Sequence, residues 1–494
     1  MRQGIRRAAA LAVVLLGLGA AQAAAAGVPN PTVEGPIAGG IKGYPWNQSL
    51  YDLRGPGYDY TENEYFYGGQ ATDLSTGQSA PYKSRMLVRL PRDPRDFSGT
   101  VLVEWLNVTG QSDFETTWPV AAQWLMRHGV GYIGVSAQLA GVCCGPTTLK
   151  GWDPQRYATL LHPSDTFAPD IFSQAIQALR DPAHNRTTIL SPKPVDPMQG
   201  MRVENVVANG ASQSASQLTS FVNGGYNRGG IDLYVITRGG GPYDDFSTPI
   251  FQINEEGNAA PQPDNAHYRA WEEAGTAHAP AAWWNYIWAE QQRDLHAPGV
   301  PDGLNLACSV NRGSADYSAR AMSAWVERYF RNGSMPPSQP RVTLDSSGNV
   351  ARDANGLALG GVRQPFVQVP VALNRSDTTD CPLWGLYRPW TSDKVTSLYK
   401  THADYVDKVR KAADADVANG TLLPEDRDDA IREAQGFDGP WAHGTCYDTY
   451  SQDSNETGPL SGAVAGVAFN DALPLSSGPT LHEVNCNVIA ANGG

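Results

Sequence analysis

The sequence lacks the features of several specialised protein classes. Beyond the first 26 residues, no stretch is apolar enough to span a bilayer, so we expect no membrane-embedded segment there. The 37 lysines and arginines are outnumbered by 50 aspartates and glutamates, and the formal net charge is −13. A chain of this charge repels nucleic acid and anionic lipid, and we expect neither as a partner.

Cysteine is scarce as well, with six in 494 residues and no Cys-x-x-Cys pair. Without that spacing, neither a zinc site nor a thioredoxin-like redox site is indicated. We therefore expect no metal and no cofactor. Cys446 and Cys486 bracket the C-terminal tail and could join it by a disulfide. Cys143 and Cys144 are adjacent, and we expect each to pair elsewhere rather than with the other.

What the chain does have is apolar sequence for a large core and a distinctive N-terminus. Hydrophobic residues make up 41% of the chain and charged residues 18%, which is typical of a globular protein. Arg2, Arg6 and Arg7 precede a short apolar run, and small residues then offer cleavage sites up to Ala26. This order is typical of a secretory signal peptide, so we expect residues 1–26 to be removed on export to the periplasm or the medium.

The next three hundred or so residues alternate strand-like and helix-like runs. This alternation predicts an α/β domain with a mostly parallel, doubly wound sheet. We assign residues 27–335 to that domain and residues 336–494 to a C-terminal extension of β and helical parts packed on it. The expected strands are 84–90, 99–107, 130–136, 203–208, 233–237, 249–253 and 268–271; the expected helices are 119–128, 167–180, 213–222, 317–330 and a pair within 395–434.

The sharpest motif is a strand, a tight turn and a helix around Gly210-Ala211-Ser212-Gln213-Ser214. An exposed serine at the apex of such a turn is the arrangement of a nucleophile elbow, which needs small neighbours two residues on either side. Gly210 is one, and Ser214 stands where glycine is usual. A rival turn, Gly134-Val135-Ser136-Ala137-Gln138, ends another strand, but Gln138 is bulky at the position that needs a small residue. We therefore prefer Ser212 to Ser136.

A serine nucleophile needs a histidine base and an acid that orients it, in the chain order serine, acid, histidine. His278 lies in a glycine-led loop after the last expected core strand, whereas His267 is at the entry to that strand. Glu255 and Glu256 follow the strand 249–253, and we prefer Glu256 because Gly257 would let the turn aim it inward. Asp244 and Asp245, after the preceding strand, are the fallback.

Two further parts complete the predicted site. The backbone amide of Gln213, together with that of Val108 or Thr109, would form an oxyanion hole. Aromatic side chains would line the substrate pocket; the candidates are Trp105, Trp118, Trp283 and Trp284.

Several segments resemble a family of bacterial exported proteins with an alpha/beta hydrolase domain. These are Glu-Trp-Leu-Asn-Val-Thr-Gly at 104–110, residues 203–214 around the serine turn, Ile-Asn-Glu-Glu-Gly-Asn at 253–258 and Ala-Gly-Thr-Ala-His at 274–278. The resemblance continues through 351–363 and 401–410, so it covers most of the chain after residue 26. It implies an α/β-hydrolase fold and a triad of Ser212, Glu256 and His278.

The leading hypothesis is an exported serine hydrolase that cleaves a carboxylic ester, small or polymeric, through an acyl-enzyme. An amidase, a peptidase or an acyltransferase would use the same triad. A hydrolase-like binding protein is the alternative from another class, although a binding module has no reason to keep all three residues. A phosphate- or cofactor-binding site at Arg238-Gly239-Gly240-Gly241 is a further alternative, but the run matches neither a P-loop nor a dinucleotide fingerprint.

Overall fold

The computed structural model describes residues 27–189, 192–296, 310–376 and 383–437. The predicted signal peptide and the predicted Cys446–Cys486 disulfide lie outside these residues. Among the described residues, no helix is both long and apolar enough to cross a membrane.

A single mixed sheet of ten strands organises the described chain, with β2 beside β3 and the others in the order β1-β3-β4-β6-β5-β7-β8-β9-β10. The strands from β6 to β10 pair in parallel, whereas β1, β3, β4 and β6 pair antiparallel. The predicted mostly parallel, doubly wound sheet is confirmed. Its strands are Thr32–Glu34 (β1), Arg54–Gly55 (β2), Tyr58–Thr72 (β3), Ser79–Pro91 (β4), Thr100–Trp105 (β5), Gly131–Val135 (β6), Asn205–Ala211 (β7), Leu233–Thr237 (β8), Ile250–Glu255 (β9) and Tyr268–Glu273 (β10).

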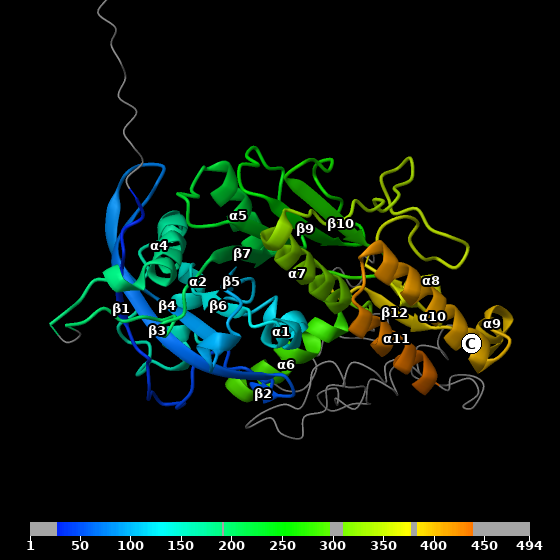
Figure 1. The fold of residues 1–494 in the computed structure, drawn as a ribbon, viewed down its shortest axis with the longest axis horizontal. Helices are drawn as coiled ribbons and strands as arrows, with labels where there is room; N and C mark the ends of the chain where they lie inside the picture. The colour runs from blue at the N-terminus through cyan, green and yellow to red at the C-terminus, as the bar shows by residue number, and fades with distance from the viewer. Residues whose placement is uncertain (1–26, 190–191, 297–309, 377–382, 438–494) are drawn as a thin grey trace, which may run out of the picture.

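Helices cover both faces of this sheet (Figure 1). Side chains alternate between the faces along each strand: on β5, Val101 and Val103 pack with α4 and α5, whereas Leu102 packs with α1, α6 and α7. The central strands are therefore apolar on both sides. The helices are Trp118–Arg127 (α1), Leu139–Val142 (α2), Leu149–Trp152 (α3), Ala168–Arg180 (α4), Gln213–Asn223 (α5), Ala281–Leu295 (α6) and Ala315–Asn332 (α7), with 3₁₀ turns at Pro94–Asp96, Asp165–Phe167 and Pro182–His184.

Two arginines of β4 are fully buried between the N-terminal strands and the loop after β5. Arg89 pairs with Glu62 at 2.7 Å and with Glu115 at 2.6 Å, while Arg85 pairs with Glu64 at 2.6 Å. Buried charges persist only when they are paired in this way, because each alone would carry a large desolvation cost. Since Glu115 belongs to the loop after β5, these pairs fix that loop against the hairpin of β3 and β4.

The region after α7 is joined to the edge of the sheet. Val362 bridges β10 in parallel beside Glu273, and Arg352 pairs with Glu256 at the end of β9 at 2.6 Å. Figure 1 shows this region at the opposite end of the molecule from β1 and β3. It holds Pro365–Gln368 (α8), Ala372–Arg375 (β11), Leu386–Pro389 (β12), Ser392–Leu398 (α9), His402–Asn419 (α10) and Pro424–Gly436 (α11).

The predicted pair of helices corresponds to α10 and α11, and the break between them has a local cause. Gly420 caps α10 in the left-handed conformation, with φ of 74°, and α11 starts at Pro424. Glycine takes that conformation without the strain that a β-carbon would cause, and proline suits a first helical turn, where its missing N–H is not needed.

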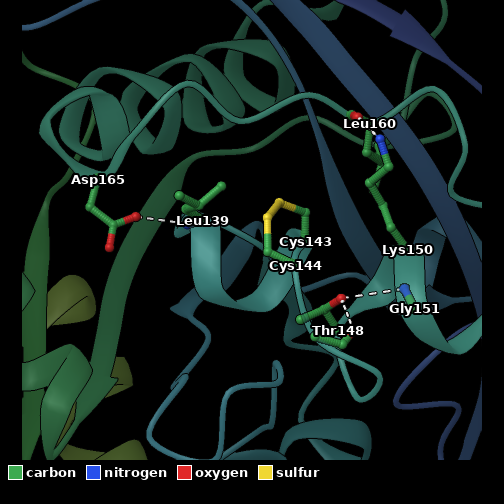
Figure 2. Close-up of a disulfide and its surroundings, with 9 residues drawn as sticks. Leu139, Cys143, Cys144, Thr148, Lys150, Gly151, Leu160 and Asp165 are labelled. Atoms are coloured by element: carbon green, nitrogen blue, oxygen red, sulfur yellow. Dashed lines mark hydrogen bonds between the residues drawn. A yellow bond between two sulfur atoms is a disulfide. The ribbon is translucent and has the colours of Figure 1, made fainter.

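Cys143 and Cys144 form a disulfide with each other at the end of α2, so the expectation that they pair elsewhere is wrong (Figure 2). The turn they form is anchored on both sides. Leu139 donates its backbone N–H to Asp165 at 2.7 Å, and the hydroxyl of Thr148 accepts from the backbone of Gly151 at 3.3 Å. Residues 139–167 contain α2, α3 and the 3₁₀ turn Asp165–Phe167.

Candidate active site

Ser212 occupies the sharp turn between β7 and α5. Its φ of 57° and ψ of −117° are a conformation that non-glycine residues rarely adopt. Gly210 allows the chain to fold back, because a β-carbon there would lie 2.9 Å from the backbone oxygen of Ser214. The hydroxyl of Ser214 in turn bonds both the backbone N–H and the backbone oxygen of Ala211, each at 2.9 Å. Serine at this position therefore ties the turn together.

His278 lies directly opposite this serine. Its Nε2 is 2.8 Å from Ser212 Oγ, and its Nδ1 is 2.7 Å from Glu255 Oε1. Because a carboxylate can only accept, Nδ1 carries the proton and Nε2 is left to accept from the hydroxyl. The three side chains come from the ends of β7 and β9 and from the loop after β10, all at the same edge of the parallel sheet.

The preference for Glu256 over Glu255 is wrong. Glu256 turns away from His278: its Oε2 accepts from the backbone N–H of Gly275 at 2.7 Å, and its Oε1 pairs with Arg352 at 2.6 Å. The structure extends β9 to Glu255, two residues further than expected. Because neighbouring strand residues point to opposite sides, the carboxylate that meets His278 is the one on β9 itself.

Burial and nearby charges act in opposite directions on Glu255. Burial alone would raise the pKa of this carboxyl, but the hydrogen bond from His278, the electrostatic interaction with its imidazole and the positive charge of Arg238 outweigh it. The net result is a pKa below the ordinary value, so Glu255 is ionised at neutral pH. Arg238 follows β8 and donates from its guanidinium to the backbone oxygen of Ala277, which also holds the loop that carries His278.

The other candidate residues lie elsewhere or are engaged. His267 is exposed at the start of β10, the opposite end of that strand from His278. Asp244 and Asp245 are exposed in the loop after β8, where Asp245 bonds the backbone and the hydroxyl of Ser247 at 2.8 Å. Ser136 is fully buried, and its hydroxyl donates to Asp113 at 2.5 Å.

The glycine run after Arg238 is a structural turn. The backbone N–H of Gly239 donates to Asn254 at 3.0 Å, and that of Gly241 donates to Thr219 at 2.8 Å. Amides that are already bonded to side chains do not form an open phosphate cradle, which argues against the phosphate-binding interpretation.

Three backbone amides were predicted as oxyanion donors, and their N–H groups have different hydrogen-bond partners in the structure. Gln213 is the first residue of α5, where a backbone N–H has no acceptor within the helix. Val108 donates weakly, at 3.3 Å, to the side-chain oxygen of Gln213. Thr109 is committed to the side chain of Asn107 at 2.8 Å, which speaks against Thr109 as the second donor. Asn107 also donates to the backbone oxygen of Ala211 at 2.8 Å and so joins this loop to the Ser212 turn.

A pocket of about 220 Å³ opens beside Ser212 and His278. Trp283 and Trp284 line it from the first turn of α6, as expected. Trp105 and Trp118 do not, because both are fully buried in the core, where Trp105 packs against Phe172 and Trp118 against Tyr132. Sequence reasoning missed Phe114 and Trp384, which also line the pocket. Trp384 lies more than a hundred residues after His278, and no sequence signal marks it.

The arrangement can activate a hydroxyl for attack on a carbonyl carbon. Ser212 Oγ would pass its proton to His278, and the ionised Glu255 would stabilise the imidazolium that forms. Within the described residues, no cluster of histidine, cysteine, aspartate or glutamate has the geometry of a metal site. The chemistry described here needs only these side chains and a water molecule.

Comparison with known proteins agrees with this geometry at the level of the family. The model of a family described as an alpha/beta hydrolase domain matches residues 33–432, which is most of the chain. With the strand order β3-β4-β6-β5-β7-β8-β9-β10 and a serine turn after β7, the fold is that of the α/β hydrolases. No curated protein matches the chain by sequence.

Two solved structures show weak similarity. A prolyl endopeptidase is 11% identical with a TM-score of 0.24, and the match covers 44% of this chain and 43% of that one. Brefeldin A esterase, a bacterial homologue of human hormone-sensitive lipase, is 15% identical with a TM-score of 0.23, covering 39% of this chain and 44% of that one. The chain therefore spans less than half the length of either, and likenesses this weak carry no inference about its substrate.

Proposed function

The chain belongs to the alpha/beta hydrolase domain family, and on that premise we propose that it is a serine hydrolase that cleaves a carboxylic ester. Ser212 is the nucleophile, His278 the general base and Glu255 the acid that orients it. One observation carries the proposal: Ser212 Oγ, the imidazole of His278 and Glu255 form a continuous hydrogen-bonded chain with distances of 2.8 and 2.7 Å.

The reaction follows from these positions. Ser212 Oγ attacks the carbonyl carbon while His278 Nε2 takes its proton, and the tetrahedral intermediate places a negative oxygen near the amides of Gln213 and Val108. Each such donor contributes about 3–4 kcal/mol to a transition state of this kind. His278 then gives the proton to the departing alcohol, which leaves the acyl group on Ser212. A water molecule, deprotonated by His278, attacks the acyl-enzyme and releases the acid.

For Val108 to serve as a donor, its N–H must leave the side-chain oxygen of Gln213. At 3.3 Å that bond is long, so the exchange for a charged oxyanion is favourable. The released carboxamide of Gln213 keeps its bond to Gln138 at 3.0 Å, which would hold it clear of the new oxyanion.

The test is labelling with a fluorophosphonate, which reacts with an activated serine, and mapping of the adduct by mass spectrometry. We expect a single adduct on Ser212 that is lost in His278→Ala and retained in Ser136→Ala, the matched control at the rival turn. A folded protein, checked by circular dichroism, that takes no adduct would contradict the proposal. Release of acid from simple acetate esters and acetanilides then separates ester from amide preference.

We also propose that the protein is exported. The support is the order of basic, apolar and small residues within residues 1–26. Mass spectrometry of the protein from fractionated bacterial cells should find a mature N-terminus at residue 24 or residue 27, in the periplasm or the medium. An intact N-terminus in the cytoplasm would contradict this proposal and leave the hydrolase assignment untouched.

A further inference from the structure

Four aromatic rings form a continuous wall along the pocket beside Ser212. They arrive from three distant segments: Phe114 from the loop after β5, Trp283 and Trp284 from α6, and Trp384 from the segment before β12. Each ring touches the next. The centroids lie 5.8 Å apart for Phe114–Trp283, 5.7 Å for Trp283–Trp284 and 6.1 Å for Trp284–Trp384.

These rings differ from the tryptophans of the core. Trp105, Trp118 and Trp271 are completely buried, whereas all four rings of the wall are only partly buried and face the pocket. Aromatic surface that remains open beside a nucleophile is unfavourable in water unless a ligand covers it. The edge-to-face arrangement of Phe114 with Trp283 and of Trp284 with Trp384 leaves ring faces and edges available for a further ring.

The size of the pocket limits what that ligand can be. Its volume is about 220 Å³. An apolar cavity of roughly 150 Å³ holds a benzene molecule, so this pocket has room for one six-membered ring and the atoms of an ester group. A long unbranched acyl chain exceeds this space. Ala279, Ile287 and Leu383 add further apolar surface to the lining, while Thr116, Thr237 and Gln291 contribute polar groups.

We propose that the substrate of this site is an ester in which an aromatic ring lies one or two bonds from the scissile carbonyl or its alkoxy oxygen. The ring packs on the wall of Phe114, Trp283, Trp284 and Trp384 and thereby places the carbonyl carbon at Ser212. This inference rests on the proposed hydrolase function and adds the substrate class.

The experiment compares esters that differ only in the π-character of the ring. Ethyl phenylacetate is paired with ethyl cyclohexylacetate for the acyl side, and benzyl acetate with cyclohexylmethyl acetate for the alcohol side. Pairs of this kind have similar size and chemical reactivity. We expect kcat/KM for the aromatic member of one pair to be higher by about 10- to 100-fold, the range that pocket contacts supply. The pair that shows the preference identifies which side of the ester the wall holds.

Variants of the pocket then identify the side chains that cause the preference for aromatic esters. Trp283→Leu and Trp284→Leu should each reduce the aromatic preference to about a third or less, mainly through KM, because the ring is bound but not chemically altered. Trp283→Phe and Trp284→Phe keep a ring and should retain most of it, which guards against a leucine variant that fails to fold. Trp325→Leu, at a tryptophan of α7 that lies outside the pocket and bonds the backbone oxygen of Gly420, is the control and should leave the preference unchanged.

Fluorophosphonate labelling of Ser212 separates the two possible failures. If Ser212 takes the label but both members of each pair are hydrolysed equally, the aromatic-substrate inference is overturned and the hydrolase function stands. If Ser212 is not labelled in a folded protein, the proposed function itself fails. A leucine variant with an undiminished aromatic preference would show that the wall is not the binding surface.

Discussion

The turns after β6 and β7 have similar sequences, Gly-Val-Ser and Gly-Ala-Ser, but their serines differ in burial and in hydrogen-bond partner. Each has glycine two residues before a serine, at the carboxyl end of a strand of the same sheet. Ser212 takes a positive φ, is partly exposed and faces His278. Ser136 is buried, and its hydroxyl is bonded to Asp113. The proposed role of Ser212 therefore depends on the histidine and the open space opposite it, and these come from other parts of the chain.

One loop touches both turns. Residues 107–117 follow β5, which lies between β6 and β7 in the sheet. Asn107, at one end of the loop, bonds the backbone of Ala211, while Asp113 accepts from Ser136. The loop thus supports the turn that carries the proposed nucleophile, Ser212, and buries Ser136 in the other turn. Substitutions in the part of the loop that contacts the Ser212 turn should therefore alter the rate of hydrolysis. Substitutions in the part that contacts Ser136 should alter the stability of the fold.

The largest expected effect comes from removing the charge of Glu255. Glu255→Gln keeps the shape of the side chain but no longer requires Nδ1 of His278 to carry the proton, and it cannot stabilise an imidazolium. We expect kcat to fall by about 10⁴-fold, as happens when an orienting acid is replaced by its amide. Steady-state hydrolysis and the rate of fluorophosphonate labelling both measure this loss.

Glu256→Gln is the matched control, one residue away and just as buried. It weakens the pair with Arg352 and so costs stability, on the order of 3 kcal/mol, because a largely buried ion pair loses one of its two charges. The labelling rate of Ser212 should stay within about tenfold of the wild type, since Glu256 acts only through the loop that carries His278. Equal rate losses in the two variants would contradict the assignment of Glu255.

An intermediate effect is expected from the link between the loop and the Ser212 turn. Asn107→Ala removes the bonds to Ala211 and Thr109 and lets the amide of Val108 drift from the position of the oxyanion. A displacement of about 1 Å in such a site costs on the order of 10²-fold, so we expect kcat to fall by about 10- to 100-fold with little change in KM. Steady-state kinetics on one ester measures both constants.

Asn209→Ala provides the comparison for that variant. Asn209 is equally buried, only three residues before Ser212, and bonds the backbone oxygen of Val235 at 2.9 Å and the hydroxyl of Thr117. Asn209→Ala should lower the melting temperature by about as much as Asn107→Ala does, because each variant loses buried hydrogen bonds of a side-chain amide. If Asn209→Ala slows the reaction as much as Asn107→Ala does, the link between loop and turn is not what matters.

The sequence contains enough to predict strands β4 to β10, the Ser212 turn and the position of His278, because each depends on local pattern or on chain order; the strands before β4 were not predicted. The choice between Glu255 and Glu256 depends on where β9 ends. Apolar residues predict the strand to Ile253, but pairing with β10 continues it through Glu255, opposite Glu273. Two residues of extra pairing decide which carboxylate faces His278, and nothing in the local sequence encodes that pairing.

The pocket was the least predictable part for the same reason. Tryptophan serves equally well in a core and in a pocket wall, so Trp105 and Trp118 could not be told from Trp283 and Trp284 by residue type. Trp283 and Trp284 lie in α6, a helix that the sequence pattern did not reveal. The C-terminal region brings Trp384 to the wall through tertiary packing alone, as it also brings Arg352 to Glu256.

The smallest expected effect is on the stability of the turn after β6, where Asp113 accepts a hydrogen bond from the buried Ser136. Burial raises the pKa of this carboxyl to about 6, although the hydrogen bond from Ser136 and the charge of Arg85 oppose the rise. Between the unfolded value of 3.8 and the folded value of about 6, the native state holds a proton that the unfolded chain has released. Stability therefore falls as pH rises through this window, by about 3 kcal/mol in all.

Asp113→Asn removes this titration and keeps an oxygen to accept from Ser136. We expect the melting temperature of the variant, relative to that of the wild type, to rise by a few degrees between pH 4 and pH 7. The difference should not change further up to pH 8. Thermal unfolding followed by circular dichroism at each pH measures the difference, and labelling of Ser212 should continue at the wild-type rate. A melting-temperature difference that is constant with pH would mean that Asp113 is already ionised at pH 4. The positive charge of Arg85 would then stabilise the ionised Asp113 more than its burial disfavours it.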